Sequence, residues 1–129
     1  MPGTSNALEA GRSGCVMVVD DDAACLEATR SLIAQWGYQP VGFATFADAR
    51  AYVAKEAPHA ALVDVRLGHY NGLQLLHLLR QSHPGCILVA VSGFADPVLK
   101  AEAERIGAHY LTKPLDLVAL RLFIAAAEE

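Results

Sequence analysis

The 129-residue chain has little positive charge and no long apolar run. Its 10 lysine and arginine residues are outnumbered by 14 acidic residues, so no basic stripe is available to neutralise a nucleic-acid backbone. No apolar stretch reaches the roughly 18 to 20 residues that a membrane-spanning helix needs, and no targeting segment opens the chain. We therefore expect no direct nucleic-acid binding, no membrane contact and a cytoplasmic location.

Cysteine is also scarce, and its distribution argues against a disulfide framework. The three cysteines, Cys15, Cys25 and Cys86, are an odd number without paired spacing. Two of them stand in apolar segments, where a reduced thiol packs as a small apolar side chain. This usage fits a protein of a reducing compartment.

What the sequence does have is apolar content, 53% of all residues, which is enough for the core of one compact domain. Residues 1–14 are rich in Gly, Ser, Ala and Pro, so we expect a flexible leader there and a folded domain at 15–129. From Cys15 onward, short apolar runs alternate with segments of helical period in five successive pairs. Such strand–helix units predict a parallel sheet with helices on both faces.

The predicted strands are Cys15–Val19, Gln39–Phe43, Ala60–Val65, Cys86–Val91 and Ala108–Leu111. The first, third and fourth are almost wholly apolar, as expected for central strands that are covered on both faces. Right-handed crossovers between parallel strands then give an open, doubly wound α/β fold of the (βα)5 type.

The segments between the strands carry helix start and stop signals. Thr45 and Asp48 form a capping-box pattern, and Asp96-Pro97 is an N-cap followed by proline at the first helical position. Gly37 and Gly107 stand just past two helix ends, where a left-handed residue is common. The inward-facing helix positions and the last cap are expected at Leu26, Ile33, Trp36, Leu73, Leu76, Leu79, Asp116, Leu120, Phe123 and Ile124.

Polar residues follow or interrupt the apolar strands at their carboxyl ends. They are Asp20, Asp21 and Asp22 after the first strand, Asp64 in the third, Ser92 after the fourth, and Lys113 and Pro114 after the fifth. Open α/β sheets place their functional crevice at this edge. Carboxylates packed together repel one another unless a cation neutralises them, and Mg²⁺ prefers hard oxygen ligands. The pattern predicts a phosphate-handling metal site, although a run of aspartates can also be a solvated turn in which Asp22 caps the next helix.

The residues Val18-Val19-Asp20-Asp21, Asp64, Ser92 and Lys113-Pro114, in this order, resemble the response-regulator receiver domains of two-component signal transduction. The resemblance covers about Cys15 to Glu129 and is specific because four short motifs stand at successive strand ends. It implies a chemotaxis-receiver-like, flavodoxin-like fold with strand order 2-1-3-4-5. It also implies a phosphoprotein of a phosphorelay, which promotes only its own phosphotransfer and dephosphorylation.

By this resemblance, Asp64 is the phosphoacceptor, which attacks phosphorus and forms an aspartyl phosphate. The phosphoryl group comes from a sensor histidine kinase or a phosphotransfer protein. Asp20, Asp21, Asp64 and the backbone carbonyl of Arg66 are the expected ligands of Mg²⁺, for which Mn²⁺ can substitute. Lys113 supplies a compact positive charge to the phosphoryl group.

The resemblance also assigns a switch. Ser92 is expected to hydrogen-bond a phosphoryl oxygen, and the peptide bond before Pro114 is expected to be cis. Tyr110 matches the switch aromatic, and its parity in the strand differs from that of Lys113, so it should face the fourth helix and not the acid pocket. The fourth helix, fifth strand and fifth helix are the expected output surface, for an effector or for a homodimer.

The sequence departs from the common family pattern at two points. Val65-Arg66-Leu67-Gly68 stands where many members have Met-Pro soon after the acceptor, and Gly93 replaces a frequent alanine. We expect the side chains of Arg66 and Phe94 to tune the phosphoryl lifetime. The histidines have no metal-ligand spacing and are expected at the surface; they are His59, His69, His77, His83 and His109.

Three other functions use a related fold or related chemistry. A flavin-binding electron carrier would need hydroxyls and glycine after the first strand, where this chain has carboxylates. A phosphatase of the haloacid dehalogenase type would need a second aspartate at the position of Arg66. A pseudo-receiver that binds partners without phosphorylation remains the alternative, and the chain can be a stand-alone receiver or part of a longer regulator.

Overall fold

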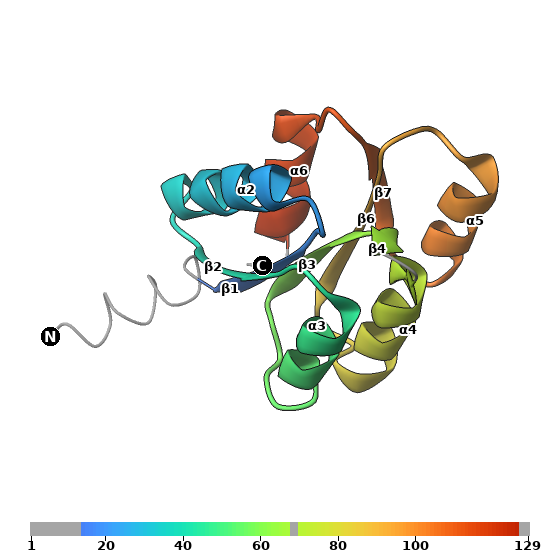
Figure 1. Cartoon of the computed structure of the whole chain (residues 1–129), viewed down its shortest axis with the longest axis horizontal. Helices are drawn as coiled ribbons and strands as arrows, with labels where there is room; N and C mark the ends of the chain where they lie inside the picture. Colours follow the sequence, from blue (N-terminus) through green and yellow to red (C-terminus); the bar gives the residue numbers. More distant parts are fainter. Residues whose placement is uncertain (1–13, 68–69, 127–129) are drawn as a thin grey trace, which may run out of the picture.

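The computed structural model describes residues 14–67 and 70–126 (Figure 1). Residues 1–13, which make up nearly all of the predicted leader, lie outside the described residues, as does His69. Gly14 is described, and its carbonyl oxygen accepts a hydrogen bond from the Gln39 N–H at 3.2 Å. The division into a leader at 1–14 and a domain at 15–129 stays a prediction.

A parallel sheet forms the centre of the molecule. Its strands are β1 (Cys15–Val19), β2 (Gln39–Phe43), β3 (Ala60–Asp64), β6 (Ile87–Ser92) and β7 (His109–Thr112). They lie in the order β2-β1-β3-β6-β7, which is the order 2-1-3-4-5 when these strands alone are counted. The predicted doubly wound fold is therefore confirmed.

Helices cover both faces of the sheet (Figure 1). α2 (Ala23–Gln35) and α6 (Leu117–Ala126) lie on one face, and α3 (Phe46–Val53), α4 (Gly72–Ser82) and α5 (Pro97–Arg105) lie on the other. The apolar residues divide accordingly, because alternate side chains of each strand point to opposite faces. Ile33, Leu120 and Ile124 pack in one core cluster, and the predicted stripe of α4 packs in the other.

The predicted helix signals are found in place. The Thr45 hydroxyl accepts the Asp48 N–H at 3.2 Å, and the Asp96 carboxylate accepts the N–H groups of two residues in the first turn of α5. Gly37 and Gly107 have φ angles of +94° and +83°, which an L side chain rarely adopts.

The strand ends differ from the prediction by one residue, and a short hairpin was not predicted. β3 ends at Asp64, although the Val65 N–H still donates to the Val91 carbonyl at 2.9 Å. β6 and β7 each begin and end one residue later than expected. The hairpin strands β4 (Arg66–Leu67) and β5 (Tyr70–Asn71) are too short to leave a periodic signal in the sequence.

The described histidines lie at partly buried positions and make specific contacts, and the side chain of His77 is 45% exposed. The Nε2 atoms of His59 and His83 lie 3.0 Å and 2.9 Å from backbone carbonyl oxygens. His77 contacts Glu102, and the His109 ring stacks on Phe123 with 3.8 Å between centroids. Imidazoles are amphipathic, so they serve here as packing groups that also satisfy polar atoms. All three cysteines are free, and no helix of the described residues is long and apolar enough to cross a membrane.

Candidate phosphorylation and metal site

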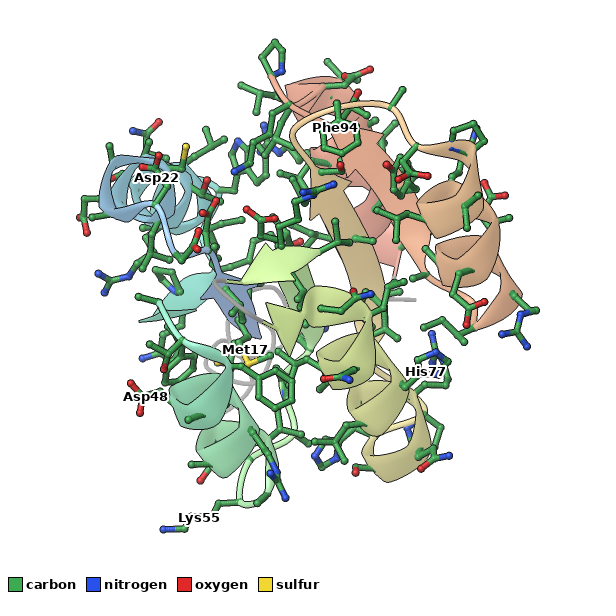
Figure 2. All side chains as sticks on the ribbon, turned by 45° about the vertical axis from the view of Figure 1, so that its right-hand side comes forward. Met17, Asp22, Asp48, Lys55, His77 and Phe94 are labelled. Atoms are coloured by element: carbon green, nitrogen blue, oxygen red, sulfur yellow. The ribbon has the colours of Figure 1, made fainter. Side chains whose placement is uncertain are left out.

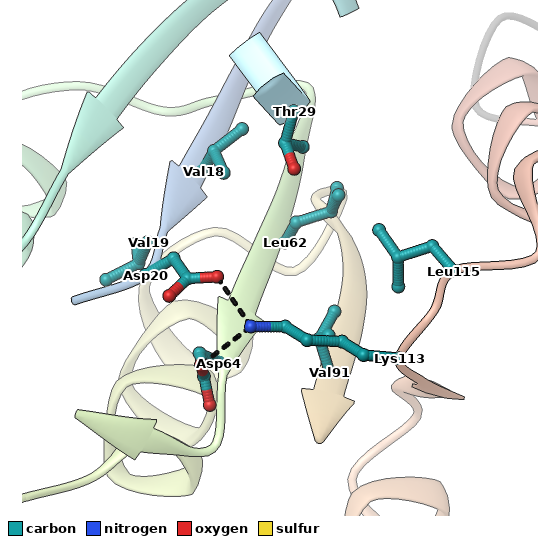
Figure 3. A pocket seen from close by; sticks show the side chains of 9 residues that line it. All are labelled: Val18, Val19, Asp20, Thr29, Leu62, Asp64, Val91, Lys113 and Leu115. Carbon is teal, nitrogen blue, oxygen red and sulfur yellow. Dashed lines mark hydrogen bonds and ion pairs between the residues drawn. The ribbon is translucent and has the colours of Figure 1, made fainter. Parts of the chain in front are cut away.

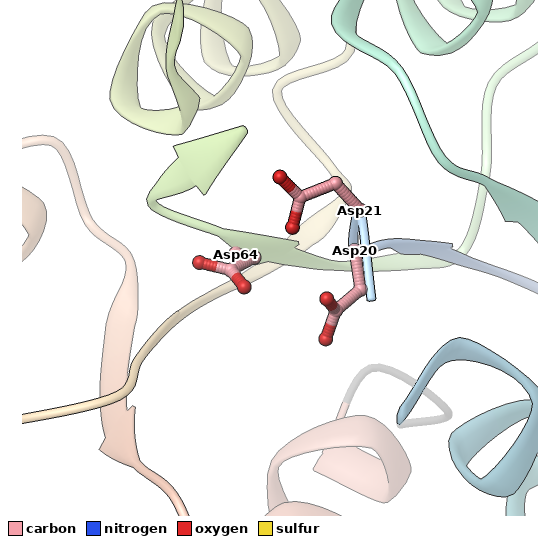
Figure 4. A group of neighbouring side chains, drawn as sticks. All are labelled: Asp20, Asp21 and Asp64. Atoms are coloured by element: carbon pink, nitrogen blue, oxygen red, sulfur yellow. The ribbon is translucent and has the colours of Figure 1, made fainter. Parts of the chain in front are cut away.

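Three carboxylates meet at the carboxyl edge of the sheet (Figure 4). β1 and β3 pair with Val19 opposite Val63, so the next residues, Asp20 and Asp64, lie side by side. Asp21 follows at the exposed rim. One oxygen atom from each of the three aspartates lies within 4.8 Å of the others.

The ammonium group of Lys113 reaches across from the loop after β7 into this cluster (Figure 3). Its Nζ donates to Asp20 Oδ2 at 2.8 Å and to Asp64 Oδ2 at 3.3 Å. The Lys113 N–H donates to the Ser92 carbonyl at 2.8 Å, which joins the loop to the end of β6. The peptide bond between Lys113 and Pro114 is cis, the isomer that the resemblance implies.

For Asp64 and for Lys113, burial shifts the pKa in one direction and the neighbouring charge of opposite sign shifts it in the other. Burial raises the pKa of the Asp64 carboxyl above its ordinary value, although the Arg66 N–H at 2.8 Å and the Lys113 charge oppose it. Burial by itself lowers the pKa of Lys113, but Asp20 and then Asp64 raise that pKa above its ordinary value. The lysine is therefore a permanent cation, which neutralises only part of the acidic cluster.

The arrangement of oxygen atoms suits a small hard cation. The site offers three carboxylates close together and only one ammonium, so negative charge is in excess. Mg²⁺ takes one or two carboxylates together with waters or phosphate oxygens. The cleft above the carboxylates is open for such ligands; it is lined by Asp20, Asp21, Asp22, Asp64, Arg66, Gly93, Phe94 and Lys113.

Ser92 and Tyr110 both contact the loop after β6. The buried Ser92 hydroxyl donates to the Phe94 carbonyl at 2.7 Å and accepts the Phe94 N–H at 3.3 Å. The Tyr110 hydroxyl donates to the same carbonyl at 3.3 Å. Tyr110 packs against the core cluster of the α3, α4 and α5 face and lines a groove with Lys100 of α5. The predicted direction of Tyr110 is confirmed.

Arg66 and Phe94 form a contact at the mouth of the cleft. The guanidinium carbon of Arg66 lies 4.6 Å from the centroid of the Phe94 ring, a cation–π geometry. Figure 2 shows Phe94 on the loop between β6 and α5, at the rim of the molecule. The ring is 45% exposed, so the pair covers one side of the cleft without closing it.

Two residues near the site were not predicted from the sequence. A Cβ atom on Gly72 would collide with the backbone carbonyl of Asp64, so only glycine lets α4 begin this close to Asp64. Thr29 of α2 lines a small cavity beside Lys113. The sequence does mark Thr29: it stands three positions after Leu26 and four before Ile33, so it is a polar residue on the apolar stripe of this helix.

Sequence comparisons identify relatives of the chain. The family model described as the response regulator receiver domain matches residues 16–125. The photosynthetic apparatus regulatory protein RegA of Rhodovulum sulfidophilum is 31% identical over 109 residues. That match covers 84% of this chain and 60% of the relative, so the chain spans about three fifths of RegA's length.

Solved structures agree with the sequence match. A CheY-like response regulator receiver domain protein from Methanospirillum hungatei superposes with a TM-score of 0.81 at 27% identity, over 88% of this chain and 95% of that one. A response regulator from Burkholderia pseudomallei, solved with a phosphorylated aspartic acid, a calcium ion and citrate, has a TM-score of 0.80 at 22% identity, over 88% and 68%. The second likeness supports the fold. From the matched residues, the site and the fold, the chain belongs to the response regulator receiver domain family.

Proposed function

We propose that this chain is the phosphoacceptor domain of a two-component response regulator, with Asp64 as the residue that carries the phosphoryl group. The observation that supports this most is the position of the Asp64 carboxylate, which lies in an open cleft beside Asp20, Asp21 and Lys113. A carboxylate that lies beside two other carboxylates and an ammonium group is the expected nucleophile for phosphoryl transfer. A residue with a purely structural role at the end of a buried strand is seldom an aspartate.

The transfer requires an ionised Asp64. One of its carboxylate oxygens attacks phosphorus, and an O–P bond forms while the P–N bond to the histidine of the donor protein breaks. The electron pair of the broken bond stays on the imidazole, which takes up a proton. The Arg66 N–H and Lys113 favour the ionised carboxylate and partly offset the effect of burial.

Asp20, Asp21, Asp64 and the carbonyl oxygen of Arg66 would hold the metal ion. Mg²⁺, or Mn²⁺ in its place, would supply positive charge that offsets the negative charge of the carboxylates and of the incoming phosphoryl group. Lys113 pairs with Asp64 before transfer and with a phosphoryl oxygen after it, because its flexible stem and compact charge allow either contact.

The output begins at Ser92. After phosphorylation its hydroxyl turns from the Phe94 carbonyl to a phosphoryl oxygen, which leaves that carbonyl to Tyr110 alone. The loop between β6 and α5 then moves, and the surface of α5, β7 and α6 changes shape. The partner that reads this change is an effector domain or a second copy of the chain. The donor is a sensor histidine kinase or a phosphotransfer protein, and the transfer takes place in the cytoplasm.

The proposal is tested by incubating the protein with Mg²⁺ and acetyl phosphate and measuring its intact mass. We expect an adduct of one phosphoryl group that chelation of the metal prevents. Asp64→Asn is the matched variant, because it keeps the size of the side chain and removes the nucleophile. The absence of an adduct, or an adduct of the same yield in the variant, would favour the pseudo-receiver alternative.

A further inference from the structure

A small cavity of about 20 Å³ lies beside the stem of Lys113, between α2 and the sheet (Figure 3). This volume is enough for about one water molecule. Most of the wall is apolar, from Val18, Val19, Leu62, Val91 and Leu115. The polar atoms belong to Asp20, Asp64, Lys113 and Thr29.

The hydrogen bonds of Lys113 explain what such a water would do. An ammonium group has three N–H donors, and the carboxylates of Asp20 and Asp64 account for two of them. The third is left for another acceptor. The Lys113 side chain is 27% exposed and also lines the open cleft, so water can reach part of the ammonium group. On the cavity side, where an N–H of a charged group would face an apolar wall, an acceptor is favoured.

Thr29 is the one neutral side chain with a hydrogen-bonding group among the residues that line the cavity. It projects from α2, and Figure 3 shows its hydroxyl oxygen on the side of the cavity that holds Asp20 and Lys113. An apolar side chain of the same shape would continue the stripe formed by Leu26 and Ile33. Packing alone therefore does not call for a hydroxyl at this position.

We propose that Thr29 is a positioning residue for Lys113 and acts through one water held in this cavity. The water accepts the third ammonium N–H, donates to the Thr29 hydroxyl oxygen, and donates its other hydrogen to the Asp20 carboxylate. A buried water with three partners is well within the usual range. It fixes the height of the ammonium group above the sheet and so sets where Lys113 can meet a phosphoryl oxygen.

This inference rests on the proposed function, because the position of Lys113 matters for phosphoryl transfer. Thr29→Val removes the hydroxyl and keeps the shape, and Thr29→Ser restores the hydroxyl. Ser31→Ala is the matched control, since it removes an exposed hydroxyl from the same helix. The measurement is the rate of adduct formation with acetyl phosphate at saturating Mg²⁺, together with the thermal unfolding midpoint.

We expect Thr29→Val to react about fivefold more slowly, as the loss of one water-mediated bond to a charged group predicts. Thr29→Ser should recover most of the rate, Ser31→Ala should match the wild type, and the unfolding midpoint of Thr29→Val should not fall. Equal rates for Thr29→Val and the wild type, or a serine variant as slow as the valine variant, would overturn the inference.

A second readout does not depend on phosphorylation. A crystal structure of the wild-type protein should contain a water within hydrogen-bond distance of both Thr29 Oγ1 and Lys113 Nζ, and the Thr29→Val structure should lack it. A wild-type cavity without this water contradicts the inference. A wild-type protein that has the water but forms no phosphoryl adduct contradicts the proposed function instead.

Discussion

Ser92 and Tyr110 donate hydrogen bonds to one acceptor, the backbone carbonyl oxygen of Phe94, at 2.7 Å and 3.3 Å. The two side chains come from neighbouring strands, whose register places Ala90 opposite Tyr110. A single carbonyl therefore links the buried hydroxyl at the edge of the acid cleft to an aromatic side chain on the α5 side. Any group that attracts the Ser92 hydroxyl changes the competition for this acceptor.

Ser92→Ala tests this link. The variant loses the donor to the Phe94 carbonyl and the acceptor of the Phe94 N–H, so the free energy of unfolding should fall by about 1 kcal/mol. It should still form the aspartyl phosphate, but the amide NMR signals of α5 should no longer shift on phosphorylation. Tyr110→Phe is the control, because it removes only the hydrogen bond from Tyr110 to the Phe94 carbonyl. Its Phe94 amide signal should still shift on phosphorylation. A Ser92→Ala protein with wild-type shifts in α5 would rule the link out.

Mg²⁺ should stabilise the folded protein against urea. A ligand that binds only the folded state adds about 2.7 kcal/mol at one hundred times its Kd, and the carboxylates proposed as its ligands exist as a cluster only after folding. Asp20→Asn and Asp21→Asn should each remove most of this gain. Glu56→Gln, which also removes one acid but at an exposed position outside the cluster, should keep it. Equal stabilisation of all four proteins would mean that Mg²⁺ acts on general surface charge.

The Arg66–Phe94 contact should slow hydrolysis of the aspartyl phosphate. The pair covers one side of the cleft, so its removal gives water freer access to the phosphorus atom. Arg66→Ala and Phe94→Ala should each shorten the phosphoryl lifetime, and the double variant should be little faster than either, since neighbours that act as a unit are not additive. The decay of the adduct by intact mass measures this. Strictly additive effects would show that the two side chains act separately.

Most of the fold and the principal site residues could be predicted from the sequence, because each was marked by a local pattern. Asp64 interrupts an apolar strand, and Asp20, Ser92 and Lys113 follow strands at the same sheet edge. Parallel pairing then brings them together without further information. The positive φ angles at Gly37 and Gly107 could also be predicted from a local signal, because each glycine stands just after a segment of helical period.

What could not be predicted depends on contacts between segments that are distant in sequence. The collision that Gly72 avoids involves the backbone of Asp64, and nothing around Gly72 signals it. The contacts of the histidines could not be predicted because their partners, such as the Ile124 carbonyl for His59, lie up to 65 residues away. The cavity beside Thr29 likewise forms only when α2 packs on three strands and on the loop after β7.

Asp64→Asn should raise the free energy of unfolding at pH 7 in the absence of metal, by on the order of 1 kcal/mol. Burial raises the pKa of Asp64, so the folded protein binds this proton more tightly than the unfolded chain does. The contribution of Asp64 to stability is therefore complete below its ordinary pKa of 3.8 and is lost as the pH rises through the raised value. Lys113 keeps Asp20 as a partner at 2.8 Å in the variant, which limits the opposing loss.

Urea unfolding of the wild type and Asp64→Asn between pH 3 and pH 8 measures this difference. The advantage of the variant should be largest at neutral pH, shrink as the pH falls toward 3.8, and shrink also when Mg²⁺ is added to the wild type. Asp116→Asn is the control, because that carboxylate caps α6 at an exposed position outside the cluster. An Asp64→Asn protein that is less stable than the wild type at neutral pH would mean that the bond from Lys113 outweighs the cost of burying the Asp64 carboxylate.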